Sequence, residues 1–140
     1  MGVNTKQFNI SLENFKGDTL EAVTKKKRLI GLKLLRGVVM KTPVDTGRAR
    51  ANWQLSINSP KTDEVTYNRK APIPSKMSER NVSGSVVAEG NAQLRTVKLG
   101  EDIYITNNLP YIKVLEDGDK NRPPNRMVFR TVMEIRESER

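Results

Sequence analysis

The feature that most constrains the fold is an apolar stripe near the N-terminus. It consists of five residues that recur at the spacing of one helix face: Leu20, Val23, Ile30, Leu34 and Val38. Asp18 and Glu21 are typical of a helix start, because their side chains can accept hydrogen bonds from free backbone N–H groups there. Thr42-Pro43 predicts the helix end, since proline disfavours helix at the residue before it. We therefore predict an amphipathic helix over residues 18–41, about 35 Å long.

Shorter patterns complete the predicted fold. Apolar and polar residues alternate over 53–57 and again over 103–106, which is the period of half-buried strands. A weaker helical stripe occupies residues 82–97, with Gly100 as its end, and a short helix is expected over 110–116, with Pro110 at its first position. A last helix begins at Arg126. The predicted class is α+β: a long amphipathic N-terminal helix and one or two further helices packed on a small, mostly antiparallel sheet.

A length of 140 residues indicates one domain. We divide the chain into an N-terminal arm or short strand over residues 1–17 and a single domain over residues 18–140. A polar segment with two prolines, residues 61–78, predicts a long loop. Only 36% of the residues are hydrophobic, so the expected core is modest. A subunit that buries more surface against neighbours has this balance, and so does a chain with long loops.

The chain contains no histidine and no cysteine, which removes much chemistry. It cannot build a Ser-His-Asp triad, a thiolate nucleophile, a disulfide or a zinc site with His or Cys ligands. An enzyme of this sequence would depend on carboxylates, lysine, tyrosine, hydroxyl groups or an oxygen-bound cation. No glycine-rich phosphate-binding motif is present. These absences narrow the possible catalytic chemistry but leave those groups open.

Asp45-Thr46-Gly47 matches the catalytic tripeptide of aspartic proteases. A homodimer could pair two such loops so that their carboxylates share one proton. The surrounding residues argue against this function, since Lys41 to Pro43 replace the apolar strand that precedes the tripeptide in those enzymes, and Arg48 replaces a small residue. The alternative is a turn in which Gly47 takes a positive φ.

Asp117, Asp119 and Asn121 have the spacing of the first ligands in a calcium loop. The EF-hand pattern next requires glycine, where this chain has Arg122, and later glutamate, where it has Val128. We interpret the segment as a solvated loop.

Positive charge is concentrated in the first part of the chain. The formal net charge is +9, and residues 1–60 hold 11 basic and 4 acidic side chains, whereas residues 101–140 hold 7 and 8. On the predicted first helix, Lys25, Lys33 and Arg36 cluster opposite the apolar stripe, with Lys26 at the margin. This asymmetry favours an oriented partner such as nucleic acid, with a solvated helix face or an acidic protein partner as alternatives. Sequence-specific readout is not expected, because none of the seven aromatic residues interleaves with these basic residues.

Two segments resemble the signatures of one protein family. Residues 42–53, TPVDTGRARANW, resemble the pattern aPvdTGrLr.sw, and residues 103–118, IYITNNLPYIKVLEDG, resemble iyisNnlPYa..lE.G. Both patterns belong to the tail-completion, or head–tail joining, proteins of long-tailed bacteriophages. The likeness covers roughly residues 18–135. This chain departs from the family at Ala49, where leucine is usual, and in the charged loop over residues 119–122.

The resemblance implies a structural virion protein of the neck or head-proximal tail end, made in the host cytoplasm. It implies that the protein is not an enzyme, so we expect no catalytic residue, no metal site and no cofactor. Such proteins form rings, most often hexamers, around the channel through which DNA passes, and they contact neighbouring neck and tail-tube proteins. It further implies that Lys25, Lys26, Lys33 and Arg36 could face DNA without reading its sequence. No membrane partner is expected, since no segment approaches the length of a membrane span. The alternative is a basic DNA-associated packaging or assembly factor of the same phage.

For the first signature we expect structural roles. Asp45 and Thr46 are expected to cap and order the turn, and Gly47 to supply an unusual φ. Arg48 is expected, like Arg50, to pair with a carboxylate of the same or a neighbouring subunit, such as Glu116. Trp53 is expected to pack in the core against the long helix.

For the second signature we also expect structural roles. Asn107 and Asn108 are expected to satisfy backbone groups at the end of their strand. Tyr111 and Leu115 are expected to anchor the short helix that Pro110 begins. The signature then closes on Glu116 and Gly118.

Overall fold

The computed structural model describes residues 20–43, 47–65 and 79–138. The elements, in chain order, are α1 (Leu20–Lys41), α2 (Arg48–Ala51), β1 (Trp53–Ile57), α3 (Glu79–Leu94), β2 (Ile103–Asn107), α4 (Ile112–Asp117) and α5 (Met127–Ser138). The predicted α+β class is confirmed, as are the long first helix and the antiparallel sheet. α2 is a single helical turn inside the segment that we expected to be a turn only.

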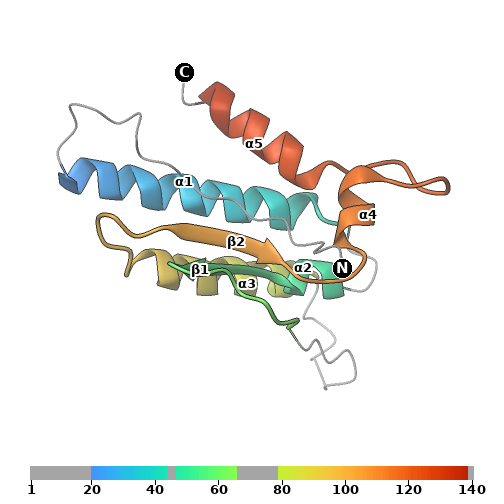
Figure 1. Cartoon of the computed structure of the whole chain (residues 1–140), viewed down its shortest axis with the longest axis horizontal. Coiled ribbons are helices and arrows are strands. Elements are labelled where there is room, and N and C mark those ends of the chain that lie inside the picture. The colour runs from blue at the N-terminus through green and yellow to red at the C-terminus, as the bar shows by residue number, and fades with distance from the viewer. Residues whose placement is uncertain (1–19, 44–46, 66–78, 139–140) are drawn as a thin grey trace.

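Helix α1 is the centre of the fold (Figure 1). It ends at Lys41, directly before Thr42-Pro43, as predicted. Val23, Leu34 and Val38 of the predicted stripe are buried, and the stripe is wider than expected, because Leu35 and Val39 are also buried. α1 packs against α3 on one side and against α5 on the other.

The sheet has two antiparallel strands, β1 and β2, in the register Trp53↔Asn107, Leu55↔Ile105 and Ile57↔Ile103. Trp53, Leu55, Ile103 and Ile105 are buried in the core that the sheet shares with α1 and α3. This alternation is the one that the sequence predicted, with apolar residues on the covered face.

Helix α3 lies close to α1 because glycines stand at their contact. A Cβ added at Gly90 would collide with the Leu35 side chain, and one at Gly31 would lie 2.9 Å from Leu94. The helix ends at Leu94, earlier than predicted, and Val97 is fully buried in the segment that follows it. Gly100 therefore belongs to the connection to β2, where its φ is 86°.

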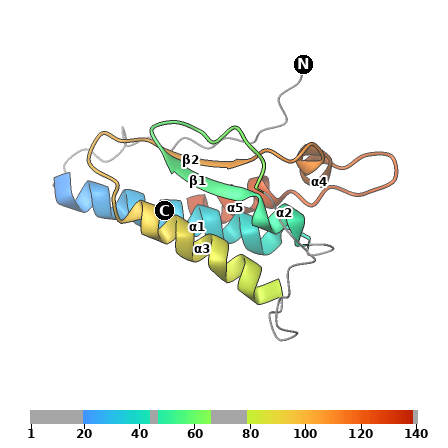
Figure 2. The same cartoon turned by 90° about the horizontal axis from the view of Figure 1, so that it is seen from below.

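Helix α5 lies on the opposite side of α1 from α3 (Figures 1 and 2). Gly37 allows this close approach, because a Cβ there would collide with the side chain of Thr131. The Lys41 ammonium also contacts a Glu134 carboxylate oxygen at 2.8 Å. The predicted helix after Arg126 is thereby confirmed, and it begins at Met127.

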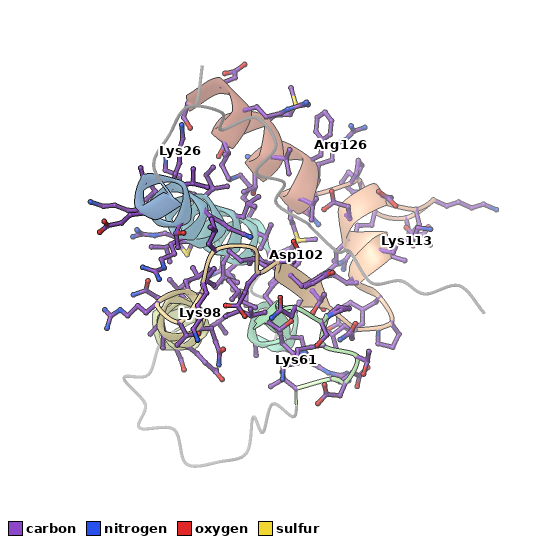
Figure 3. All side chains as sticks on the ribbon, turned by 60° about the vertical axis from the view of Figure 1, so that its left-hand side comes forward. Lys26, Lys61, Lys98, Asp102, Lys113 and Arg126 are labelled. Carbon is purple, nitrogen blue, oxygen red and sulfur yellow. The ribbon has the colours of Figure 1, made fainter. Side chains whose placement is uncertain are left out.

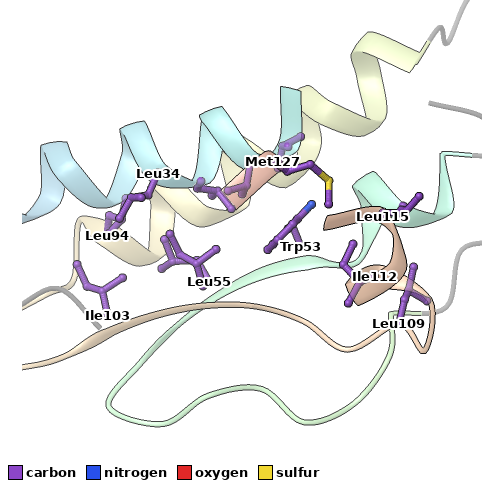
Figure 4. Packing of buried hydrophobic residues seen from close by; sticks show 14 of the residues in the cluster. Leu34, Trp53, Leu55, Leu94, Ile103, Leu109, Ile112, Leu115 and Met127 are labelled. Atoms are coloured by element: carbon purple, nitrogen blue, oxygen red, sulfur yellow. The ribbon is translucent and has the colours of Figure 1, made fainter. Parts of the chain in front are cut away.

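The described elements share one hydrophobic cluster (Figure 4). Trp53 is 2% exposed and lies among the buried side chains at the end of the core formed by α4 and the start of α5. Leu109, Ile112, Leu115 and Met127 supply the apolar surface at this end.

Several expectations lie outside the described residues. They are the arm over residues 1–17, the helix cap at Asp18, the turn residues Asp45 and Thr46, and the part of the predicted loop over residues 66–78. Within the part that the structure describes, no helix is long and apolar enough to cross a membrane.

Candidate functional site

The two segments that carry the family resemblance meet at one end of the sheet. Trp53, the last residue of the first signature, is the register partner of Asn107 in the second. Their elements are about fifty residues apart in sequence, yet they form adjacent strand ends. The candidate functional site is this junction of the two segments at the Trp53–Asn107 end of the sheet.

Asn107 joins the two signatures through its side-chain amide. Its Nδ2 donates to the Ala49 carbonyl oxygen at 2.9 Å, and its Oδ1 accepts a hydrogen bond from the Leu109 N–H at 3.2 Å. Asn107 is fully buried, so water cannot replace these two hydrogen bonds to backbone groups. The prediction that this asparagine satisfies backbone groups at the strand end is confirmed.

Asn108 holds the segment that follows β1. Its Nδ2 donates to the carbonyl oxygens of Lys61 and Asp63, at 2.8 and 3.0 Å. From the neighbouring strand, Gln54 Nε2 donates to the same Asp63 carbonyl at 2.9 Å. Residues 61–63 are therefore tied to both strands, and the predicted role of Asn108 is confirmed.

Asn52 ties the same return segment to the first signature. Its Oδ1 accepts from the Val65 N–H at 2.7 Å, and its Nδ2 donates to the carbonyl oxygens of Val65 and Arg48 at 3.2 and 2.9 Å. The Asn52 amide thus binds both the N–H and the carbonyl group of Val65, as the backbone of a neighbouring strand would. We did not predict a role for Asn52, although asparagine in the turn before a strand commonly makes such contacts.

Trp53 is a core residue, as predicted. Its indole Nε1 donates to Thr42 Oγ1 at 2.8 Å, and the Thr42 hydroxyl donates to the Val38 carbonyl at 2.6 Å. The hydroxyl therefore links the end of α1 to β1 while satisfying a buried N–H.

The turn before Trp53 depends on Gly47, whose φ is 76°. This left-handed conformation is strained for a residue with a side chain, so the prediction of an unusual φ at Gly47 is confirmed. α2 begins at the next residue, and the Ala51 N–H donates to the Gly47 carbonyl at 3.0 Å.

The two arginines of the first signature have different environments. Arg50 donates to the carbonyl oxygens of Thr42 and Met40, at 2.8 and 3.2 Å, and to Ser83 Oγ at 3.0 Å. It therefore caps the last turn of α1, where carbonyl groups lack helical partners. Arg48 makes a longer, exposed contact of 3.4 Å with Glu64.

Arg48 pairs with a carboxylate, as expected, but with that of Glu64, and the expectation that Glu116 of the same chain pairs with Arg48 or Arg50 is wrong. Its two carboxylate oxygens accept hydrogen bonds from the N–H groups of Val128 and Phe129, at 2.9 and 3.1 Å. Glu116 thus caps the N-terminus of α5 from a different helix, where negative charge is favourable. Sequence patterns for helix caps involve residues next to the helix start. They therefore give no indication that Glu116, at the end of another helix, caps α5.

Gly118 and the loop after it bring the start of α5 to Glu116. Gly118 has a φ of 76°, and a Cβ there would lie 2.7 Å from the Pro124 nitrogen and 2.8 Å from the Arg122 carbonyl oxygen. Asp119 and Arg122 form an isolated antiparallel bridge at the tip. The chain then returns so that the Arg126 N–H donates to the Glu116 carbonyl at 3.1 Å.

Two of the three residues with calcium-loop spacing, Asp119 and Asn121, contact each other in the loop. Asp119 Oδ1 accepts the Asn121 N–H at 2.9 Å, which is a local turn contact. Among the described residues, no group of three or more acidic side chains is placed to hold a metal ion.

Leu115 anchors α4, as predicted, because only 3% of it is exposed. The same prediction for Tyr111 is wrong, since this residue precedes the helix and is 37% exposed. Pro110 is also exposed and lies before the helix, which begins at Ile112. Tyr111 and Pro110 are therefore surface features of this end.

The predicted basic residues Lys25, Lys26, Lys33 and Arg36 all lie on α1. Lys25 and Arg36 are exposed, whereas Lys26 and Lys33 are half-buried and have interaction partners. The exposed side of α1 is not purely basic, because Leu29 and Met40 are 50% and 55% exposed there. Other charged residues lie elsewhere on the molecule (Figure 3): Lys61 follows β1, Lys98 follows α3, and Lys113 lies on α4.

Lys27 is buried and Arg28 is half-buried, and neither was predicted. Only 2% of Lys27 is exposed, and Arg28 Nη2 donates to the buried Val97 carbonyl at 2.7 Å. A signal for Lys27 was present, because it falls four residues after Val23 and seven before Leu34, within the apolar stripe.

No protein-family model, curated protein or solved structure matches this chain.

Proposed function

We propose that the protein is a structural virion component of a tailed bacteriophage. It acts in tail completion or head–tail joining, as a ring around the DNA channel at the neck or head-proximal tail end. The observation that carries this proposal is that the two segments resembling the family's signatures join each other, through the Trp53–Asn107 pair and the bond from Asn107 to Ala49.

The polar signature residues support a structural role rather than catalysis. Asn107 and Glu116 are buried, and their polar atoms bind backbone groups of other elements. Arg50 caps the end of α1. Side chains whose polar atoms bind backbone groups hold the elements in fixed positions. A ring subunit needs such a rigid shape in order to fit its neighbours.

The exposed side of α1 suits a channel that passes DNA. Lys25 and Arg36 are exposed on it, and the chain carries a net charge of +9. Such residues attract phosphates without reading sequence, and the attraction weakens with salt. We place this side of α1 toward the lumen.

The direct test is disruption of the gene in the phage that carries it. The proposal predicts that filled heads and tails accumulate unjoined in lysates viewed by electron microscopy, and that wild-type protein supplied from a plasmid restores joined particles. Normal joined particles from the disrupted phage would contradict it.

The net charge also favours a second candidate, a basic DNA-associated packaging or assembly factor. That function predicts empty heads after disruption, and steeply salt-dependent binding of the purified chain to duplex DNA. The neck function predicts filled heads and detection of the protein in mature virions.

A further inference from the structure

The face of the sheet that points away from the core is polar and covered. Gln54 and Ser56 of β1 and Thr106 of β2 lie on it, because alternate residues of each strand face the core. Residues 59–65, which we call the strap, fold back over this face, on the side of the sheet away from α1 (Figures 3 and 4). All residues over 61–65 are exposed.

The strap is held by its main chain. The side-chain amides of Asn52, Gln54 and Asn108 bind the backbone of residues 61–65, and Ser56 Oγ donates to the first carbonyl oxygen of the strap at 2.6 Å. Each of these bonds runs from a side chain beside or on the sheet to a backbone group of the strap. Their net contribution to stability is small, because water offers exposed backbone groups the same kind of bond.

Little else holds the strap to the sheet. Its last residue, Val65, is 36% exposed, and Glu64 makes only an exposed contact of 3.4 Å with Arg48. Exposed ion pairs of this kind stabilise a fold weakly. Of the residues that the structure describes, the hydrophobic cluster includes none from the strap. The core therefore stays packed if the strap lifts.

The closed strap also has a cost at Thr106. This residue is 0% exposed, and its Oγ1 has no hydrogen-bond partner. Gln54 is its register partner, Asn108 lies two residues further along the same face, and both bind the Asp63 carbonyl, so the strap crosses the sheet at Thr106. A buried hydroxyl without a partner destabilises the closed form, and it regains water when the strap lifts.

We propose that residues 59–65 lift from the sheet as one unit while the core stays folded. Asn58 is the fixed end of the strap, since its N–H donates to the Asp102 carbonyl at 2.8 Å and its side-chain amide to Glu101 at 2.7 Å. Opening hydrates Thr106 and frees the side-chain amides that bind the strap. The protein can thereby change the surface of its sheet without unfolding. This proposal does not depend on the proposed function.

The absence of cysteine from the chain allows a direct test by thiol labelling. Thr106→Cys places a thiol under the strap, and Ile105→Cys places one on the core face of the same strand; both positions are 0% exposed. We expect N-ethylmaleimide to label Thr106→Cys through local opening, with little dependence on low urea concentrations. Ile105→Cys should react only through global unfolding, with a steep urea dependence. Equal rates and equal urea dependence of the two variants would overturn the proposal.

Hydrogen exchange of the Val65 N–H tests whether the strap moves as a unit. In the wild-type chain this N–H donates to Asn52 Oδ1 at 2.7 Å, and it should exchange faster than the amides of the β1–β2 ladder. Gln54→Ala removes a bond to Asp63, two residues away, and should speed Val65 exchange by up to about fivefold, the equivalent of one ordinary hydrogen bond. Gln93→Ala, the same change at an exposed position of α3, should leave it unchanged.

The two measurements have to agree. A Val65 amide that exchanges only as slowly as the ladder amides, or that does not respond to Gln54→Ala, contradicts opening as a unit. Rapid Val65 exchange with a Thr106→Cys thiol that reacts only on global unfolding shows fraying at one end and also overturns the proposal. Circular dichroism of each variant checks its fold, and the wild-type exchange decides if a cysteine variant does not fold.

Discussion

At the scale of single residues, most of the junction depends on side chains that bind backbone groups of other segments. The Trp53 indole finds its acceptor in Thr42 Oγ1, at 2.8 Å. Glu116 accepts two N–H groups of α5, and Asn107 bridges both signatures. Each of these residues stabilises one particular approach of two elements.

Replacement of Trp53 by alanine should lower the free energy of unfolding by about 3–5 kcal/mol, because a large buried side chain is lost and a cavity remains. Urea unfolding followed by circular dichroism measures it. Trp53→Phe keeps the ring but not the N–H, so it should lose less. An unchanged midpoint for Trp53→Ala would remove Trp53 from the core.

Replacement of Glu116 by alanine should cost about 1–3 kcal/mol of unfolding free energy, since two N–H groups at the start of α5 lose a charged acceptor. Glu116→Gln retains one acceptor oxygen and should recover part of the loss. Unfolding midpoints of the three proteins test this order. Equal stability of Glu116→Ala and the wild-type chain would show that the cap contributes nothing.

At the scale of elements, the helices around α1 approach closely where glycines permit it. α3 contains two glycines with opposite surroundings: Gly90 faces the buried Leu35 side chain, and Gly84 faces open space. Alanine substitutions at these two positions can therefore be compared within one helix. At Gly90 the added methyl group meets a packed side chain, whereas at Gly84 only the helix propensity changes.

Gly90→Ala should destabilise the protein by about 1–3 kcal/mol, because the added methyl group overlaps a packed side chain. Gly84→Ala should instead stabilise it by about 0.5–1 kcal/mol through helix propensity. Thermal or urea unfolding of both variants tests the difference. A loss of stability in Gly84→Ala equal to that in Gly90→Ala would contradict the packing of α3 on α1.

Glu101 makes hydrogen bonds within the connection between α3 and β2 and to the end of β1. Its carboxylate accepts the Lys98 N–H and the Asn58 Nδ2 amide, both at 2.7 Å, and these hydrogen bonds hold the pKa of Glu101 below its ordinary value. A carboxyl with a lowered folded-state pKa contributes stability above its unfolded pKa, and this contribution is lost as pH falls through the folded value.

We therefore expect the Glu101 carboxyl to titrate below the ordinary glutamate range in an NMR experiment. Asn58→Gly removes the amide donor but keeps the left-handed backbone, where Asn58 has a φ of 69°. In that variant the pKa of Glu101 should rise, yet stay lowered by the Lys98 N–H. A Glu101 pKa at or above the ordinary value in the wild-type chain would contradict these contacts.

The sequence predicted elements better than it predicted contacts between them. The stripe from Val23 to Val38 specifies α1, and alternation specifies both strands, because these patterns are local. The cap from Glu116 to α5 and the hydrogen bonds of Arg50 to the end of α1 connect distant segments. Residue types alone do not indicate which distant backbone group a carboxylate or guanidinium will meet, so their partners were mispredicted or missed.

At the scale of the whole molecule, two unlike surfaces flank a central helix. α5 exposes Phe129 and Met133 among charged residues, and a groove of about 370 Å³ lies between α1 and α3. The exposed side of α1 carries Lys25 and Arg36, together with Leu29 and Met40. Arg36 and Met40 also line the groove, so the exposed side of α1 is continuous with it.

A ring subunit of the kind proposed must assemble into a closed ring in solution. The most direct measurement is native mass spectrometry of the full-length protein at near-physiological ionic strength, with electron microscopy of the same sample. The proposed function predicts one dominant closed assembly, a hexamer of the 15.8 kDa chain, seen as rings with a central channel. A monomer at every concentration, or an open series of multimers with no closed ring, would contradict it.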